Sequence, residues 1–346
     1  MNPKHPDFPL SGFSNAGTVP PYRQRRRPTK RTFQRAAGAE PQDVYTKITA
    51  RIIADLEQGV RPWARPWNAG NLDGRIMRPL RHNGLPYSGI NVLMLWLAAE
   101  EHGFTSPTWM TFKQAIELGG HVRKGEHGSQ VVYANTITKT EQGDDGSDVT
   151  RNTPFLKGYT VFCVDQIDGL PDQYRARPPP KFTPVERIEH ADAYFAALKA
   201  EIHYRGNRAF YSVGNDCIQI PPIETFRDAE SFYATLGHEC IHWTKHSSRL
   251  DRNFGSKGFG SEGYAHEELV AELGAAFLCA DLELTPEIRE DHAAYIATWL
   301  TALKNDKRLI VQAASHAQRA TEYLHRLQPG GLEVAPDTEP DGLTPS

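Results

Sequence analysis

Cysteine is scarce in this chain, and long apolar runs are missing. The four cysteines among 346 residues lie far apart and form no CxxC pair, which excludes a disulfide scaffold and an all-cysteine zinc ribbon. The longest apolar run, residues 92–99, is far below the roughly 20 residues that span a bilayer, so we expect no membrane protein. The first residues lack the charged-then-apolar order of a secretory signal, and we expect a cytoplasmic protein.

Charge is unevenly distributed along the chain. The formal net charge is -3, yet residues 1–41 carry a net charge of +6. This segment is rich in Pro, Gly, Ser, Arg and Gln and has no apolar periodicity, so we predict a disordered basic tail. Such a tail suits a polyanionic partner, and a solvated tail without a fixed partner is an equally good interpretation. Residues 329–346 are predicted to form a second disordered tail.

Apolar periodicity and turn residues predict the elements between the tails. Helices are expected over about residues 43–58, 88–101, 111–118, 184–201, 228–246, 264–282, 286–304 and 306–327. Strands are expected at residues 130–138, 155–164, 208–213 and 217–220, with a hairpin loop at 141–148. The Pro-rich stretch 168–183 is predicted to be a linker. The predicted fold class is α+β, with a mixed α+β domain at 42–167 and a mostly helical domain at 184–328.

A five-residue motif in the second half carries the strongest functional signal. His238-Glu239-Cys240-Ile241-His242 has the HExxH pattern within a stretch predicted to be helical. Residues four apart share one face of a helix, so both imidazoles can bind one zinc ion. Glu239 can then accept a proton from a water whose pKa zinc lowers to about 7. The alternative is an accidental histidine pair on a charged helix, and the apolar residues that flank the motif argue against it.

A third protein ligand must lie further along the chain. The metzincin extension is absent, because position 245 is lysine and position 248 is serine. Glu268 and Glu272, four residues apart in the next predicted helix, resemble the gluzincin arrangement, in which a second helix supplies a carboxylate ligand. On that resemblance Glu268 is the third ligand and Glu272 orients an imidazole N–H, while the reverse assignment stays open. We expect one divalent metal per chain, zinc by the motif, with Mn2+ or another ion open.

Several neighbouring side chains have less specific interpretations. Glu267 lies about 100° from Glu268 around the helix and is expected to be solvated. Tyr264 or His266 could stabilise an oxyanion. Residues 209–211 could form an edge strand that holds an extended peptide through main-chain hydrogen bonds.

Residues 61–162 combine exposed-type aromatic residues with cationic residues. Stacking of bases on aromatic rings, with cations along the phosphates, is how proteins hold single strands without reading their sequence. Aromatic residues in such segments are also common in hydrophobic cores. Composition alone therefore leaves both interpretations open.

Linked motifs in a fixed order give the chain a more specific resemblance. In the first half they are Pro62-Trp63 with Pro66-Trp67, then residues 83–91, 109–114 and 122–128. Together these resemble the N-terminal single-stranded-DNA-binding domain of the ArdC-type antirestriction family. The HExxH motif, its continuation Trp243-Thr244, Arg249-Leu250 and residues 268–277 resemble that family's zincin-like metallopeptidase domain. The resemblance covers about residues 42–328.

The resemblance implies a conjugation- or plasmid-associated protein that binds single-stranded DNA and protects incoming DNA from restriction. It also implies a C-terminal zincin-like metallopeptidase whose protein substrate is unidentified, restriction enzymes being candidates. On this resemblance the DNA-binding residues, which stack on bases, shape the groove or meet phosphates, are Trp63, Trp67, Tyr87, Trp109, Arg123 and Lys124.

A second function is compatible with the same motifs. It is a single-stranded-DNA-binding replication or primase accessory protein whose metal site is structural or vestigial. Glu239 argues against a vestigial site, because a purely structural metal site needs no general base. Both functions predict single-stranded DNA as the partner, and neither predicts a membrane.

Overall fold

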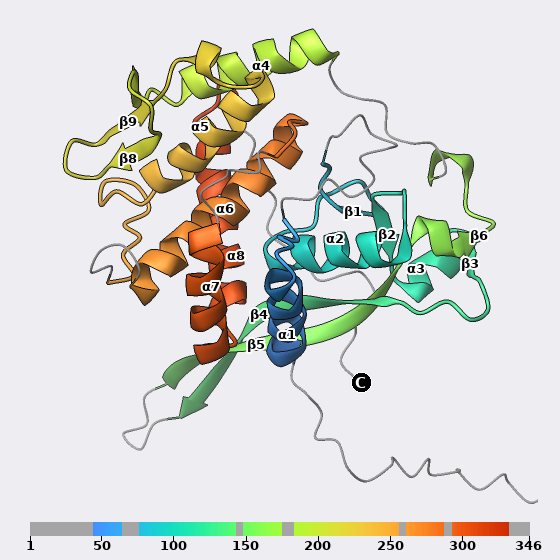
Figure 1. Cartoon of the computed structure of the whole chain (residues 1–346). Helices are drawn as coiled ribbons and strands as arrows, with labels where there is room; N and C mark the ends of the chain where they lie inside the picture. The colour runs from blue at the N-terminus through green and yellow to red at the C-terminus, as the bar shows by residue number, and fades with distance from the viewer. Residues whose placement is uncertain are drawn as a thin grey trace, which may run out of the picture. The chain divides into compact units, whose positions relative to one another are not determined.

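The computed structural model of the chain describes residues 44–63, 76–142, 148–174, 183–255, 261–286 and 293–331. The predicted tail 1–41 and most of the predicted tail 329–346 lie outside these ranges. The α+β class is confirmed, with a mixed N-terminal half and a mostly helical C-terminal half (Figure 1). Every helix among the described residues is too short or too polar to cross a bilayer.

Local sequence signals explain the helices of the N-terminal half. Helix α1 (Val44–Glu57) buries an apolar stripe that includes Ile52. Helix α2 (Ile90–His102) is apolar almost all round and largely buried. Helix α3 (Phe112–Glu117) starts with a capping box, in which the Thr111 hydroxyl accepts from the Gln114 N–H and the Gln114 side chain accepts from the Thr111 N–H.

Two sheets complete this half. Strands β1 (Leu80–Arg81), β2 (Thr108–Met110), β4 (Ser129–Gln142) and β5 (Asp148–Cys163) form one sheet in the order β1-β2-β5-β4. Strands β3 (His121–Val122) and β6 (Ile167–Asp168) pair antiparallel as a second sheet. Asn91 of α2 fixes that helix on β4, since its amide group exchanges two hydrogen bonds with the backbone of Val132, at 2.7 and 2.8 Å.

The C-terminal half begins with a helix and a small sheet. Helix α4 (Pro184–Ala197) opens with a capping box between Thr183 and Glu186 and has proline at its first position. Strands β7 (Glu201–Tyr204), β8 (Phe210–Ser212) and β9 (Cys217–Ile220) form a sheet in the order β7-β9-β8, which leaves β8 at an edge. Short 3-10 turns lie at Val164–Gln166, Asp172–Tyr174 and Ile223–Thr225.

Long helices form the body of this half. Helix α5 (Ala229–Trp243) starts at Asp228, whose carboxylate accepts from the Ser231 N–H, and α6 (Glu262–Leu282) is capped by Ser261. Helices α7 (Ala293–Asn305) and α8 (Leu309–Arg326) follow. An added Cβ at Gly274 of α6 would lie 2.9 Å from the Ile241 side chain of α5. Glycine at this position therefore allows the two helices to pack closely.

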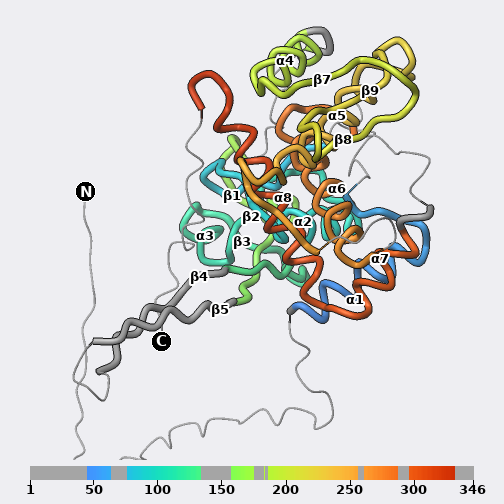
Figure 2. The backbone as a smooth tube through the Cα atoms, turned by 90° about the vertical axis from the view of Figure 1, so that its left-hand side faces the viewer, coloured from blue at the N-terminus to red at the C-terminus, as the bar shows by residue number. Residues whose placement is uncertain are grey.

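Segments of the N-terminal half pack directly on these helices. Arg78 forms two hydrogen bonds with the Asp281 carboxylate of α6, at 2.9 and 2.8 Å, and its guanidinium stacks on Phe277 at 4.6 Å. Helix α1 lies beside α7 in both views (Figures 1 and 2). Residues 42–346 form one compact unit, and a division of this unit into two domains stays a prediction. The predicted linker, 168–183, is described only to residue 174 and at 183.

The predicted helices are found with shifts at several ends, and β4 and β5 are longer than predicted and extend into the expected hairpin loop 141–148. The helix expected from residue 88 begins at Ile90, with Gly89 at the N-cap position. The helix predicted to reach residue 201 ends earlier: Lys199 has a left-handed backbone with φ 55°, and β7 starts two residues later. Strands of two or three residues, such as β1 and β3, carry no periodicity that a sequence pattern could detect.

Candidate metal centre

The two histidines of the HExxH motif lie on the buried face of α5. Their rings meet edge to face with centroids 4.8 Å apart, as expected for residues one turn apart on a helix. Both side chains are buried, and so is Glu239 between them in the sequence. Burial requires each polar atom to have a partner, and α6 supplies the partners.

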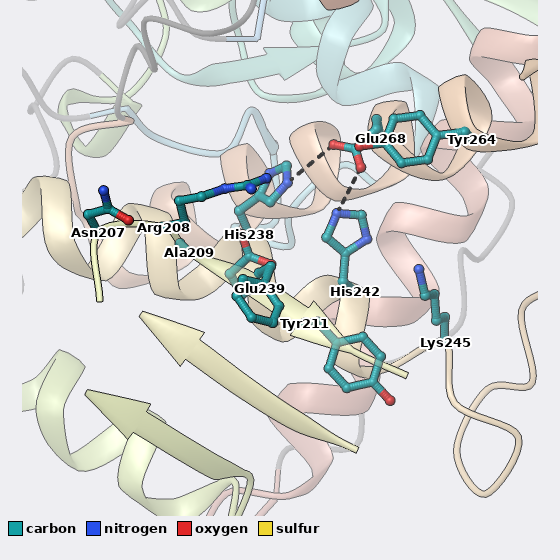
Figure 3. A pocket seen from close by; sticks show the side chains of 11 residues that line it. Asn207, Arg208, Ala209, Tyr211, His238, Glu239, His242, Lys245, Tyr264 and Glu268 are labelled. Carbon is teal, nitrogen blue, oxygen red and sulfur yellow. Dashed lines mark ion pairs between the residues drawn. The ribbon is translucent and has the colours of Figure 1, made fainter. Parts of the chain in front are cut away.

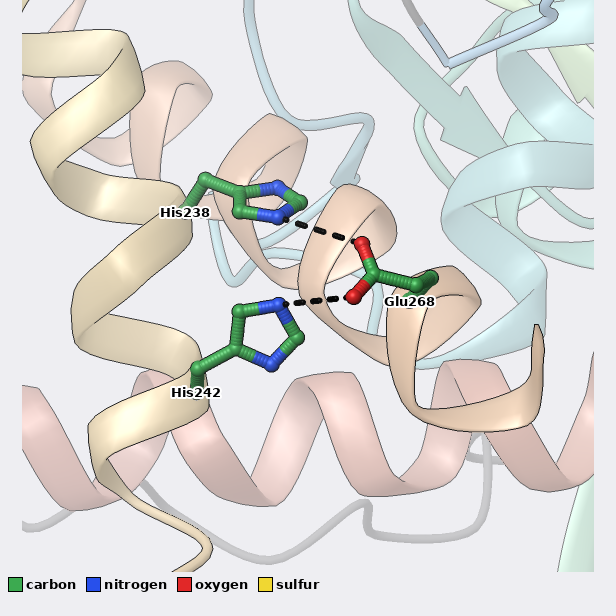
Figure 4. Close-up of side chains that lie close together, drawn as sticks. All are labelled: His238, His242 and Glu268. Carbon is green, nitrogen blue, oxygen red and sulfur yellow. Dashed lines mark ion pairs between the residues drawn. The ribbon is translucent and has the colours of Figure 1, made fainter. Parts of the chain in front are cut away.

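Glu268 of α6 faces both imidazoles at once (Figure 4). One carboxylate oxygen lies 3.6 Å from Nε2 of His238 and the other lies 3.5 Å from Nε2 of His242. The ligand atoms of the three residues all lie within 4.8 Å of one another. Ligands about 2.1 Å from a tetrahedral ion are themselves about 3.4 Å apart, so this donor set fits a divalent ion. The structure thus brings His238, His242 and Glu268 together, and their role as ligands stays a prediction.

The other nitrogen of each ring meets a second carboxylate. Glu272 lies 3.5 Å from Nδ1 of His238, and Glu267 lies 3.0 Å from Nδ1 of His242. This arrangement favours Glu268 as the ligand and Glu272 as the residue that orients His238. The expectation that Glu267 is solvated is wrong, because only 5% of it is exposed. The helical angle was right, but the space beside Glu268 is filled by His242 and Arg252.

Arg252, in the loop after α5, holds Glu267 in place. Its guanidinium donates to both carboxylate oxygens of Glu267 at 2.8 Å, and to the Ile241 carbonyl at 2.9 Å. Burial disfavours the charged carboxylate, but Arg252 and His242 outweigh this and lower the pKa of Glu267 to about 2. No sequence pattern singled out Arg252; an arginine ten residues after a motif histidine is too common to be a signal.

Electrostatics around Glu268 favour a bound cation. Burial lowers the pKa of His242, but the charges of Glu268 and Glu267 outweigh it and raise that pKa to about 9. Burial raises the pKa of Glu268, and both histidines more than reverse this, so its pKa falls far below the ordinary value. Without a metal, the site holds a proton on His242 between two carboxylates. A divalent ion satisfies the same negative potential and displaces that proton.

A cleft of ≈350 Å³ opens onto the three candidate ligands (Figure 3). Glu239 lines it beside the histidines, and the edge strand β8 forms one wall with Tyr211. Tyr264 also lines the cleft, whereas His266 does not: its ring stacks on Phe254 with centroids 3.8 Å apart. Of the two candidates for oxyanion stabilisation, the geometry therefore supports Tyr264.

Comparisons with known proteins agree with this geometry. Residues 42–162 match the family described as the N-terminal domain of anti-restriction factor ArdC, and residues 189–316 match the family of zincin-like metallopeptidases. Among solved structures, the metal-free antirestriction ArdC protein from the R388 plasmid is 48% identical, with a TM-score of 0.69. That match covers 82% of this chain and 97% of the R388 chain.

The chain belongs to the ArdC antirestriction family. The Mn(II)-bound structure of the R388 ArdC protein is similarly related, at 47% identity and a TM-score of 0.66, covering 82% of this chain and 98% of that chain. A metal ion in an ArdC relative agrees with the donor set found here. The comparison supports a divalent ion, and zinc in this ArdC family member stays a prediction.

Two further relatives differ in how much of their own length this chain matches. An uncharacterized protein, y4eC from Sinorhizobium fredii, is 40% identical over 294 residues, covering 83% of this chain and 93% of its own. The DNA primase TraC of Escherichia coli is 36% identical over 295 residues, covering 81% of this chain but only 27% of TraC. The ArdC-like part is thus one segment of a longer protein in TraC.

The aromatic residues predicted to contact DNA are mostly inside the fold. Trp63, Tyr87 and Trp109 are exposed by 1%, 3% and 0%; Trp63 packs edge to face on Trp299 with centroids 5.8 Å apart. A ring without an accessible face cannot stack on a base, so these three residues cannot stack on bases of a bound strand. The other predicted role, shaping the groove, is compatible with their burial. Trp67 lies outside the described residues.

The two predicted phosphate contacts differ from each other. The Arg123 guanidinium is held by Glu126 at 2.7 Å and by the Asp165 carbonyl at 2.6 Å, so its charge is partly used within the protein. Lys124 is exposed and has no ion-pair partner among the described residues. Lys124 is therefore the better placed of the two to meet a phosphate.

Trp63 connects the N-terminal half to the candidate metal centre. Its indole N–H donates to Glu272 at 3.3 Å, and Arg61 donates to the same oxygen at 3.4 Å. We expect Trp63→Phe to weaken metal binding about three- to tenfold, at or below the 10–100-fold typical of residues that contact a ligand histidine. Competition with a chromophoric chelator measures this.

Trp96→Phe is the matched control for that variant. Trp96 is also buried, and its N–H donates to the Met77 carbonyl at 2.8 Å rather than to a residue of the candidate metal centre. Both variants lose one indole hydrogen bond and a comparable packing volume. Equal metal affinities for the two variants would show that the Trp63 contact does not support the site.

Acid stability of the metal-free protein is expected to depend on His266. Burial lowers its pKa to about 4 from 6.5, so its contribution is fully present above pH 6.5 and is lost as the pH falls toward 4. His266→Phe keeps the stack on Phe254, and Nε2 has no hydrogen-bond partner among the described residues. Between pH 6.5 and 4, the unfolding free energy of wild type should therefore fall by up to about 3 kcal/mol more than that of the His266→Phe variant.

Denaturant unfolding in EDTA at several pH values tests this expectation. His242, with a pKa of about 9, is protonated throughout the interval and adds little slope. Glu267, with a pKa of about 2, loses its contribution to stability mainly below this pH interval. That loss is common to both proteins. Parallel stability curves for wild type and variant between pH 6.5 and 4 would contradict the prediction.

Proposed function

We propose that this protein binds single-stranded DNA, carries a zinc-dependent peptidase centre, and protects incoming plasmid or conjugative DNA from restriction. The observation that carries the proposal is one partly buried carboxylate, Glu268, placed against both HExxH imidazoles, with Glu239 beside them on the same cleft. The zincin-like family match supports the peptidase, and the ArdC match supports antirestriction.

Each residue of the centre has a defined task in this proposal. His238, His242 and Glu268 hold the divalent ion, which when bound acidifies water and polarises a substrate carbonyl. Glu239 accepts the proton of the attacking water and donates it to the leaving amine. Glu272 and Glu267 keep the Nδ1 protons in place, so that each Nε2 lone pair points toward the ion.

The walls of the cleft can position a peptide. Strand β8 is an edge strand on the cleft and offers its free backbone groups to an extended substrate by strand addition. The Tyr264 hydroxyl can donate to the oxygen of the tetrahedral intermediate. Cys240 takes no part, because it is fully buried and burial raises its thiol pKa well above the ordinary value.

The DNA function is tested by salt-dependent binding of the full chain. We expect single-strand affinity to fall steeply with salt, with a log–log slope of about -0.7 for each neutralised phosphate. Fluorescence anisotropy with labelled oligothymidylate and a matched duplex measures it. A flat salt profile, or no binding, would overturn the DNA-binding part of the proposal.

A primase or replication accessory function is the second candidate. The match to DNA primase TraC favours it, although this chain spans only 27% of that protein. Its metal site would be structural or vestigial. This candidate would be favoured if wild type and the Glu239→Gln variant stimulate a priming reaction equally and neither protects DNA from restriction.

A further inference from the structure

A polar pocket of ≈350 Å³ lies apart from the metal cleft, between the start of α1 and the first turns of α8. The two segments are joined by the Thr49 hydroxyl, which donates to the Lys307 carbonyl at 2.7 Å. Tyr45 forms one wall, and Arg308, Gln312, Ser315, His316 and Arg319 are among the other lining residues. None of them belongs to the candidate metal centre.

Two arginines line this pocket without a carboxylate partner among the described residues. The buried arginines Arg78 and Arg252 pair with the carboxylates of Asp281 and Glu267. Arg308 and Arg319 are exposed. The Arg308 guanidinium lies over the Tyr45 ring at 5.9 Å. That of Arg319 lies 2.8 Å from Nδ1 of His316. Both positive charges are therefore available to an anion from outside.

The arrangement matches the chemistry of one nucleotide. Guanidinium groups bind phosphate oxygens in a forked geometry, and a tyrosine ring offers a stacking face to a base. Ser315 and Gln312 add hydrogen-bonding groups in the same pocket. The basic segment 1–41, with a net charge of +6, precedes α1 directly in the sequence.

We propose that this pocket holds one nucleotide of a bound single strand, with its phosphate on Arg308 and Arg319 and its base on Tyr45. The proposal rests on the single-strand binding proposed above and gives it a specific surface. It places a DNA contact on the C-terminal helices as well as on the N-terminal half. It also supplies an aromatic face that buried Trp63, Tyr87 and Trp109 do not offer.

Single substitutions in the full chain test the phosphate contacts. Arg308→Gln and Arg319→Gln should each lower affinity for labelled oligothymidylate about fivefold at 0.1 M salt. Each should also reduce the log–log salt slope by about 0.7, because one phosphate contact is lost. Tyr45→Leu should lower affinity about tenfold and leave the slope unchanged. Thermal unfolding of each variant shows that the fold is kept.

Arg326→Gln is the matched control. Arg326 is an exposed arginine of the same helix that also lies over a tyrosine ring, Tyr323, at 5.8 Å, outside the pocket. Removing it changes the net charge equally, so affinity and slope should stay at wild-type values. An equal loss with this variant would overturn the pocket assignment in favour of general electrostatic attraction.

Photocrosslinking supplies a direct readout. Oligothymidylate carrying 5-iodouracil should crosslink to the peptide that contains Tyr45. If wild type binds the strand and the three pocket variants bind equally well, the pocket assignment alone fails. If wild type binds no single strand, the proposed DNA function fails with it. Binding of inorganic phosphate is measured on the same variants. If they lose phosphate binding but keep wild-type affinity for the strand, the pocket is a free-anion site and the DNA assignment is overturned.

Discussion

Protein carrying His238→Ala is expected to lose its bound divalent ion completely while keeping wild-type affinity for single-stranded DNA. The ion depends on three ligands from two helices, and two remaining ligands do not hold a catalytic-type site. Wild type should contain about one equivalent of metal per chain. Metal content and oligothymidylate binding, measured on the same purified sample, check both halves of the expectation.

Glu268→Gln and Glu272→Gln separate the two possible third ligands. Glu268 contacts both Nε2 atoms, so Glu268→Gln should remove the ion as His238→Ala does. Of the imidazole nitrogens, Glu272 faces Nδ1 of His238 rather than an Nε2 atom, so Glu272→Gln should retain the ion with affinity reduced about 10–100-fold. The opposite ranking would make Glu272 the ligand. Absence of metal from wild type would remove the enzyme assignment and leave a DNA-binding protein.

Substitution of Glu239 by glutamine is expected to retain both the ion and the DNA while abolishing protection from restriction. Glutamine has nearly the same shape but cannot accept the proton of the attacking water. General bases contribute about 10²–10⁴-fold to a rate, which is enough to stop a slow proteolytic reaction in a cell. The measurement is the survival of restriction-sensitive DNA delivered by conjugation into a restricting recipient.

Glu201→Gln is a suitable control for that experiment. Glu201 is an exposed residue of the same half. Among the interactions described, its side chain contacts only the His203 side chain. It makes the same chemical change outside the cleft and should protect as wild type does. Equal protection by the Glu239→Gln variant would remove proteolysis from the mechanism and leave DNA binding as its basis.

The sequence by itself determined the long helices and the chemistry of the motif. The caps at Thr111, Thr183 and Asp228 and the apolar periodicity are local, so they predict helices without knowledge of the fold. The HExxH spacing is also local, because residues four apart on a helix share a face whatever surrounds them. For the same reason Glu268 and Glu272 could be selected together as the supply of the third ligand.

Only the tertiary structure decided which partner each of these groups meets. Glu267 becomes buried against His242 because Arg252, fifteen residues away in sequence, folds back over it. Trp63 and Trp109 become core residues, whereas Phe112 is exposed, and nothing in composition distinguishes these aromatic rings. Burial depends on long-range packing, and a local pattern carries no information about the surfaces that meet. The contact between Trp63 and Glu272 arises in the same way. So does the pocket at Tyr45, whose arginines have no carboxylate partner in the part of the chain that the structure describes.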